Sequence, residues 1–199
     1  MADLYLASTS PRRATLLQQI GVAFSCLPVE VDETPQVNED PAEFVVRVAS
    51  AKARYGAAQQ AANDGIPVLG ADTAVVIAQK ILGKPASVEA AREMLRSLSG
   101  RQHRVLSAVA VVADNALQTR ISETLVTFCP LNEQQIKHYV DSGEPKGKAG
   151  SYAIQGLAAA FIRQIHGSYS GVMGLPLQET SELLIELNIP FAANGQFSA

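Results

Sequence analysis

The stretch Leu4-Tyr5-Leu6-Ala7-Ser8-Thr9-Ser10-Pro11-Arg12-Arg13 predicts how the fold begins. Its first four residues are apolar and predict a short strand. Ser10 is a good helix N-cap, and Pro11 suits the first helical position because its missing N–H would be unpaired there. Apolar residues at helical spacing follow and end at Gly21. We therefore expect a strand that leads through a tight turn directly into a helix.

The same turn gathers groups that bind anions. Ser8 and Ser10 supply hydroxyls, and Arg12 and Arg13 supply two guanidinium groups. A helix N-terminus adds free N–H groups and partial positive charge, and arginine pairs well with phosphate oxygens. Phosphate is the obvious ligand for such a turn. The alternative is an ordinary capped helix with solvated arginines, because capped helices are common.

The composition narrows the class of protein. With 199 residues, 47% hydrophobic and 18% charged, the chain can bury a real core and is not expected to be disordered. Its formal net charge of −3 argues against a nonspecific nucleic-acid surface. We see no apolar run near the roughly 20 residues of a membrane span and no secretory signal pattern. We expect no nucleic-acid or membrane partner and a cytoplasmic location.

The cysteines and histidines do not suggest a metal centre. Cys26 and Cys129 lie far apart in apolar, strand-like runs, which predicts two free, buried thiols in a reducing compartment. His103, His138 and His166 also lack ligand spacing. We interpret them as surface or structural residues and expect no transition-metal site.

Strand and helix patterns alternate early in the chain, and a long antiparallel hairpin follows in the middle. This order predicts an α/β fold of mixed, α+β-like character, with a mixed twisted sheet and flanking helices. No linker divides residues 1–199, so we expect a single domain in which any second lobe is an excursion from the sheet. The expected strands are 4–7, 22–29, 66–70, 74–78, 104–113 and 119–128, and the expected later helices are 41–62 (stopped at 63–65), 88–98, 132–143 and 175–187.

Two acidic motifs follow expected strands. The run Glu30-Val31-Asp32-Glu33 is either a solvated acidic loop or a holder of a hard divalent cation. In Gly70-Ala71-Asp72-Thr73 the carboxylate comes at the end of a buried strand, where α/β folds open their clefts. The alternative for Asp72 is an Asx-turn.

Three further residues could contact a ligand. Lys84 lies between glycine and proline, which fix the backbone and aim the ammonium, although an exposed lysine is the default. Lys52, on the long helix, is a possible phosphate contact or a solvated lysine. In the segment 147–156, small residues let a ligand approach the backbone, and Gln155 offers both a donor and an acceptor. A uracil or thymine edge, which alternates carbonyl and imide N–H, suits such an amide.

Taken in order, these segments resemble the Maf family of nucleoside triphosphate pyrophosphatases from Leu4 to about Leu187. Arg12 of S-P-R-R, Thr73 of G-A-D-T and Gln155 of Y-x-I-Q-G resemble the branch that acts on dTTP and UTP. The branch that acts on 7-methyl-GTP has a tryptophan after the proline, G-S-D-Q at the aspartate and a glutamate in place of Gln155. This chain has none of those three features. The matching stretches are 8–13, 30–33, 70–73, 83–85, 147–156 and 167–177.

The resemblance implies hydrolysis of a nucleoside triphosphate to its monophosphate and pyrophosphate with a divalent cation, Mg²⁺ or Mn²⁺. It also implies a nucleotide cleft between two lobes, a homodimer and a cytoplasmic protein. Asp72 matches the family's proton acceptor, and Arg12, Thr73 and Gln155 match its substrate-selecting positions. The alternatives are a 7-methyl-GTP or other noncanonical triphosphate pyrophosphatase and a noncatalytic nucleotide-binding regulator of septum formation.

A mechanism can be assigned to these residues as a hypothesis. Glu33 and Asp72 suit the metal, because Mg²⁺ binds through one or two carboxylates together with phosphates and waters. Adjacent arginines point about 100° apart on a helix, so one is expected to hold phosphate while the other pairs with a carboxylate such as Glu33. The expected catalytic residues are Asp72, Lys84 and Glu33, and the expected substrate-binding residues are Ser8, Ser10, Arg12, Arg13, Thr73, Gln155 and Lys52.

Overall fold

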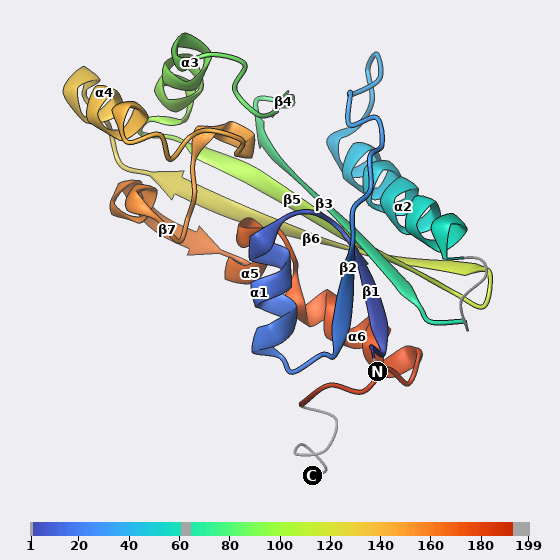
Figure 1. The fold of residues 1–199 in the computed structure, drawn as a ribbon. Coiled ribbons are helices and arrows are strands. Elements are labelled where there is room, and N and C mark those ends of the chain that lie inside the picture. Colours follow the sequence, from blue (N-terminus) through green and yellow to red (C-terminus); the bar gives the residue numbers. More distant parts are fainter. Residues whose placement is uncertain (1, 61–64, 193–199) are drawn as a thin grey trace.

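The computed structural model describes residues 2–60 and 65–192, and its centre is a seven-stranded mixed sheet (Figure 1). The strand order is β2-β1-β3-β5-β6-β7, and β4 pairs with β3 beside this path. β1 is parallel to β2 and β3, and all other pairs are antiparallel. The predicted mixed α/β fold is confirmed. The strands are β1 Leu4–Ala7, β2 Phe24–Leu27, β3 Val68–Ile77, β4 Lys80–Leu82, β5 Gln102–Ala113, β6 Ala116–Phe128 and β7 Ile162–His166.

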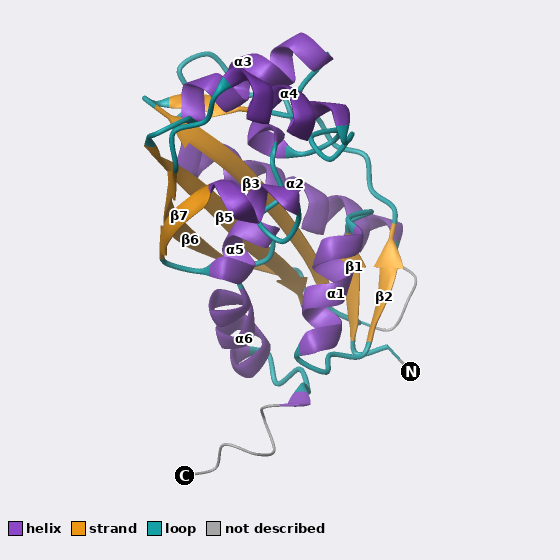
Figure 2. Ribbon diagram, turned by 90° about the vertical axis from the view of Figure 1, so that its left-hand side faces the viewer, coloured by secondary structure: helices purple, strands orange, loops and turns teal. Residues whose placement is uncertain are grey.

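Helices cover both faces of the sheet (Figures 1 and 2). Among the described helices, only α2 packs on one face, against β3 and β5. On the other face α1 and α6 cover one end, whereas α3 and α4 cover the other end. The α-helices are α1 Pro11–Gln19, α2 Pro41–Gln59, α3 Val88–Leu98, α4 Glu133–Asp141, α5 Tyr169–Met173 and α6 Leu177–Glu186.

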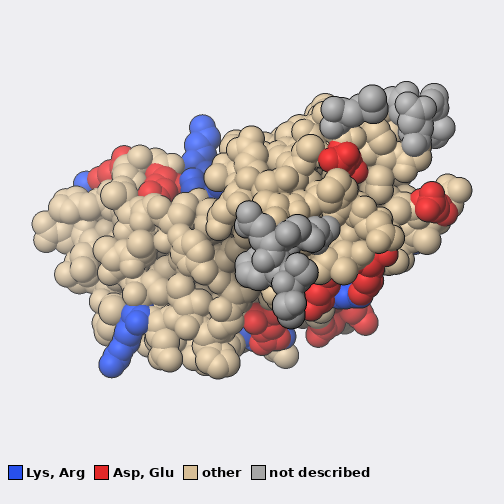
Figure 3. Space-filling view, turned by 90° about the horizontal axis from the view of Figure 1, so that it is seen from below, with Lys and Arg blue, Asp and Glu red and all other residues tan. Residues whose placement is uncertain are grey.

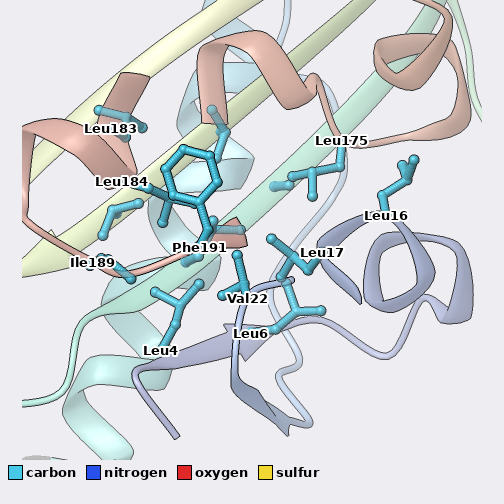
Figure 4. Close-up of a cluster of buried hydrophobic side chains, with 14 residues drawn as sticks. Leu4, Leu6, Leu16, Leu17, Val22, Leu175, Leu183, Leu184, Ile189 and Phe191 are labelled. Atoms are coloured by element: carbon cyan, nitrogen blue, oxygen red, sulfur yellow. The ribbon is translucent and has the colours of Figure 1, made fainter. Parts of the chain in front are cut away.

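The second face therefore carries two separate hydrophobic cores. Figure 4 shows the first, which includes Leu6 of β1, Leu17 of α1 and Leu184 of α6. The second joins Leu95 of α3, Ile136 of α4 and residues of β5 and β6. Burial of such apolar side chains stabilises each end of the sheet, and Met173 packs against both cores. The space between the two cores is where a cleft can form.

Local sequence signals set most helix starts. The side chain of Ser87 accepts a hydrogen bond from the N–H of Ala90, and Asn132 and Gln135 form a complete capping box at α4. Ser10 occupies the predicted N-cap position of α1, but its side chain makes no capping hydrogen bond. Asp40 caps α2, which ends at Gln59 with Gln60 as its C-cap, slightly before the predicted end. The predicted end of this helix involves residues 61–64, which lie outside the described residues.

The prediction of two strands at 66–70 and 74–78 is wrong, because β3 runs unbroken from Val68 to Ile77. Its pairing with β5 is continuous from Val68↔Val112 to Val76↔Arg104. This long-range pairing keeps the polar residues Asp72 and Thr73 in the strand. The short β4, the edge strand β7 and the helix α5 were not predicted.

The cysteines are free, as predicted, but they are not buried. Cys26 is exposed and Cys129 is half-buried. Cys26 lies on β2, an edge strand of the sheet, whose four residues are all exposed or half-buried. His103 is buried, and its Nε2 shares a hydrogen bond of 2.9 Å with the Tyr152 hydroxyl, which agrees with a structural role.

On the surface seen from below, most described residues are neither acidic nor basic, several acidic side chains gather beside basic ones, and the basic side chains drawn there form no continuous area (Figure 3). Across residues 2–60 and 65–192, no helix combines the length and apolar character that crossing a bilayer requires.

Candidate active site

The site lies at an opening along one edge of β3. Pairing between β1 and β3 ends at Ala7↔Gly70, and pairing between β3 and β4 begins only at Val75. The residues between them, 71–74, have no strand partner on this edge within the described chain, although β5 pairs with all four on the other edge. The sheet is therefore open at the middle of β3.

Two neighbouring β3 residues reach this opening from opposite faces. Asp72 points towards α2, and Thr73 points the other way and shares a hydrogen bond of 2.8 Å with the Ser107 hydroxyl. Successive side chains of a strand alternate between faces, so only an open edge lets both line one space. That space is a cavity of about 430 Å³, within the range of small-molecule sites. The expected strand end at Asp72 is thus corrected: the cleft exists because β1 ends, while β3 continues.

Four charged side chains form a chain of ion pairs in this cavity. Lys52 of α2 places its Nζ 2.8 Å from Asp72 Oδ1 and 2.7 Å from Glu33 Oε1. Lys84 Nζ lies 2.7 Å from the second oxygen, Glu33 Oε2. Lys52 and Asp72 are only 6% and 7% exposed, so the interpretation of Lys52 as a solvated lysine is wrong. The structure brings together all four residues that the sequence placed in separate motifs.

Glu33 is the central member of this cluster. Partial burial alone would raise the pKa of its carboxyl, but hydrogen bonds from Lys52 and Lys84 outweigh that effect and lower the pKa to about 2. Glu33 and Asp72 also converge on one cation, the Lys52 ammonium, from two sides. In the acidic run, Glu30 and Asp32 remain exposed, and only Glu33 joins the cluster.

The two arginines of the opening turn have different surroundings. Arg13 donates from Nε to the Gly174 carbonyl at 2.7 Å and from Nη1 to Ser8 Oγ at 3.3 Å. It forms no ion pair with Glu33 in the described structure, which corrects the expected carboxylate contact. Arg12 lines the cavity, and its buried Nε has no hydrogen-bond partner among the described residues. Burial lowers the pKa of both guanidinium groups, although nearby Asp72 and Glu33 oppose this at Arg13.

The two serines of the turn also differ. Ser8 is buried, and its Oγ accepts a hydrogen bond from the Ser10 N–H at 3.1 Å as well as the one from Arg13. Ser8 does not line the cavity, whereas Ser10 does. Ser8 therefore stabilises the turn at the start of α1 through these hydrogen bonds, from a position outside the cavity lining.

A second wall of the cavity is a tight turn that presents Gln155. The Gly156 N–H donates to the Ala153 carbonyl at 3.0 Å, so Gln155 stands near the tip of this turn. Its side chain lines the cavity together with Lys148 and Tyr152. Lys148 was not singled out from the sequence, although its place among glycines and alanine in the segment 147–150 was a usable signal.

The lining has a strong charge bias. Five cationic side chains and two carboxylates give it a net charge of +3, in a chain whose formal charge is −3. Such concentration of one sign in a cleft attracts and holds an anionic ligand. The cationic residues are Arg12, Arg13, Lys52, Lys84 and Lys148.

Comparison with known proteins gives consistent relatives. A protein from Nitrosospira multiformis named dTTP/UTP pyrophosphatase is 51% identical over 193 residues, which cover 92% of this chain and 93% of the relative. Relatives with the same name from Xanthomonas euvesicatoria (52% identical; 91% of this chain and 96% of the relative) and Escherichia coli O157:H7 (48% identical; 94% of each) match over similar lengths. The family model described as Maf-like protein matches residues 3–187. That range includes both walls of the cavity, and the chain belongs to the Maf-like protein family.

Proposed function

We propose that this chain is a nucleoside triphosphate pyrophosphatase that converts dTTP and UTP to their monophosphates and pyrophosphate. The observation that carries the proposal is the cavity itself, with paired carboxylates in a cationic lining at one wall and an amide at the other. The names of relatives that are 48–52% identical over nearly the whole chain support the same substrates.

The cationic lining suits a triphosphate tail. Arg12 has an unpartnered buried Nε at the cavity, and the first N–H groups of α1 lie beside it. Lys84 and Lys148 face the same space. Phosphate oxygens placed there would find several donors and a helix N-terminus, which stabilise the charge that shifts onto the departing pyrophosphate.

Asp72 is the proposed proton acceptor. A water oxygen attacks the α-phosphorus, its proton passes to an Asp72 oxygen, and the bond from the α-phosphorus to the bridging oxygen breaks to release pyrophosphate. Lys52 holds the carboxylate in position through the 2.8 Å ion pair. Arg13 supports this arrangement indirectly, because it ties the start of α1 to the Gly174 carbonyl.

A divalent cation, Mg²⁺ or Mn²⁺, is part of the proposal. Glu33 and Asp72 fit it, because their oxygens already converge on one positive charge and are hard oxygen donors. No third His, Cys, Asp or Glu joins them in the described part of the chain, which suits Mg²⁺, since it completes its shell with phosphates and waters. Bound there, the cation would neutralise phosphate charge and acidify water.

Base selection is assigned to the wall that carries Gln155. The Gln155 amide can both donate to and accept from the edge of uracil or thymine. Thr73 lines the same cavity with its hydroxyl held by Ser107, and Arg12 lines it as well. The homodimer and the cytoplasmic location remain predictions from the family.

The test is pyrophosphate release from a panel of triphosphates, namely dTTP, UTP, CTP, 7-methyl-GTP and inosine triphosphate, with Mg²⁺ or Mn²⁺. We expect the highest kcat/KM for dTTP and UTP and no release without a divalent cation. Release confined to 7-methyl-GTP or inosine triphosphate would reject the proposed substrates, and no release from any would support a noncatalytic nucleotide-binding protein.

A further inference from the structure

The turn that carries Gln155 is held at both ends by one pair of side chains, Tyr139 and Glu144. Glu144 follows α4, and its carboxylate accepts hydrogen bonds from the backbone N–H of Leu157 at 2.8 Å and of Ala158 at 3.3 Å. Tyr139, within α4, donates its hydroxyl to Glu144 at 2.9 Å and accepts from the Ala153 N–H at 3.3 Å. These contacts bracket Gln155 on both sides in the sequence.

The glycine next to Gln155 is fitted to this carboxylate. A Cβ placed on Gly156 would come within 2.4 Å of Glu144 Oε2 and 2.5 Å of Oε1. Only a residue without a side chain allows the carboxylate to lie so close to the turn. The turn and the Glu144 carboxylate are therefore packed in direct contact.

The chemistry of the contacts makes this unit stiff. The N–H groups of Leu157 and Ala158 begin a short 3₁₀ helix, Leu157–Phe161, and lack partners within it. A carboxylate binds such N–H groups more strongly than a neutral acceptor does. Burial and the hydrogen bond to Glu144 raise the pKa of Tyr139, so its hydroxyl stays protonated and continues to donate.

We propose that Glu144 and Tyr139 are positioning residues for base selection, because they fix the backbone from which Gln155 reads the edge of the pyrimidine. This inference rests on the proposed function. An amide distinguishes uracil from cytosine only if its donor and acceptor are held at defined positions, since rotation or displacement would let it accommodate either edge. Neither residue lines the cavity, so neither contacts the substrate directly.

The experiment compares the kcat/KM ratio for UTP over CTP in the wild type, Glu144→Gln and Tyr139→Phe. Glu144→Gln preserves shape but turns one acceptor into a donor that faces other donors. Tyr139→Phe removes one hydroxyl and keeps the ring that packs edge-on against Phe161. For each variant we expect the ratio to fall by about tenfold, equivalent to about 1.4 kcal/mol of discrimination.

The matched control is Glu133→Gln. This change removes a carboxylate at the start of α4, where Glu133 pairs with Arg96 at the surface. We expect it to keep the wild-type ratio. A purely structural role would lower the Tm, or reduce activity on UTP and CTP equally, and leave the ratio unchanged. An unchanged ratio in Tyr139→Phe would overturn the inference, even if Glu144→Gln failed to fold.

The inference and the proposed function fail in distinguishable ways. If the wild-type protein releases no pyrophosphate from any triphosphate, the proposed activity is wrong. The affinity ratio for UMP over CMP, measured by calorimetry on the same variants, then decides the positioning role. A fall in that ratio would support it, and equal ratios or absence of binding would overturn it.

Discussion

The two walls of the cavity are built by different means. At the Asp72 wall, side chains from α2, β3 and the acidic loop meet through ion pairs, and the position of each charge depends on the others. At the Gln155 wall, the backbone is held by hydrogen bonds to Glu144 and Tyr139, and one neutral side chain projects from it. The difference shows that charges can position one another, whereas a lone amide needs a fixed backbone.

The largest expected effect comes from Asp72→Asn. This change removes the proton acceptor but leaves Lys52 paired with Glu33, so the fold and nucleotide binding should persist. We expect kcat to fall by about 10³-fold, within the range that a general base contributes. Pyrophosphate release under saturating dTTP measures it, with Asp114→Asn in the β5–β6 turn as a control. Turnover equal to the parent's would show that Asp72 is not the base.

The second prediction concerns the stability of the protein when Lys52, which joins Asp72 to Glu33, is replaced in Lys52→Met. The variant leaves two carboxylates facing each other without their shared cation, and removal of one partner from a buried pair costs about 3 kcal/mol. Urea unfolding at neutral pH measures the loss. Lys137→Met, in an exposed pair with Asp141, is the control and should change stability by less than about 1 kcal/mol. A loss equal to the control's would contradict the cluster.

The pH dependence of stability reports on Glu33. Its pKa is lowered from 4.5 to about 2 in the folded protein. A depressed folded-state pKa stabilises the protein above the ordinary value, and this contribution is lost as the pH falls from about 4.5 to about 2. In Lys52→Met the pKa of Glu33 should rise, so this acid-dependent loss should shrink. Thermal unfolding from pH 2 to pH 6 measures it, and identical profiles for both proteins would count against this role of Lys52.

Substitutions at two glycines, Gly70 and Gly156, test how well each wall of the cavity tolerates an added side chain. A Cβ at Gly70 would lie 2.4 Å from the Ala49 carbonyl oxygen and 2.6 Å from the Ala53 nitrogen, both backbone atoms of α2, whereas at Gly156 its three nearest atoms belong to the Glu144 side chain. We expect Gly70→Ala to destabilise the protein by about 2 kcal/mol and Gly156→Ala by less, because a side chain can move away. Gly83→Ala, with nothing within 4 Å, is the control in urea unfolding. A larger loss of stability in Gly156→Ala than in Gly70→Ala would contradict this difference between the two walls.

The smallest effect on stability is expected for Lys84→Gln. The Lys84 side chain is 62% exposed, and an exposed ion pair contributes less than about 1 kcal/mol. The loss of a cation at the cavity should instead raise KM for dTTP severalfold, with kcat reduced less than in Asp72→Asn. Steady-state kinetics with both variants separates these effects. Unchanged KM and kcat in Lys84→Gln would show that Lys84 does not act in the site.

Local sequence signals predicted the elements whose causes are local. The capping box at Asn132 and the turn at Asp114-Asn115 form as expected, because a few neighbouring side chains satisfy the backbone. The continuous β3 and the short β4 were missed, because each depends on pairing with distant strands. Cys26 was expected to be buried, and only the order of strands shows that β2 is an edge.

By itself the sequence determined the residue types of the site, their motifs and the family resemblance, because these are properties of short segments. Only the tertiary structure decided that Lys52 joins Asp72 to Glu33, and that Glu144 holds the turn of Gln155. Those contacts join residues that are far apart in the chain or belong to different elements. The opening beside Asp72 exists because β1 stops at Ala7 while β3 continues, and this lets side chains from both faces of the sheet line one cavity.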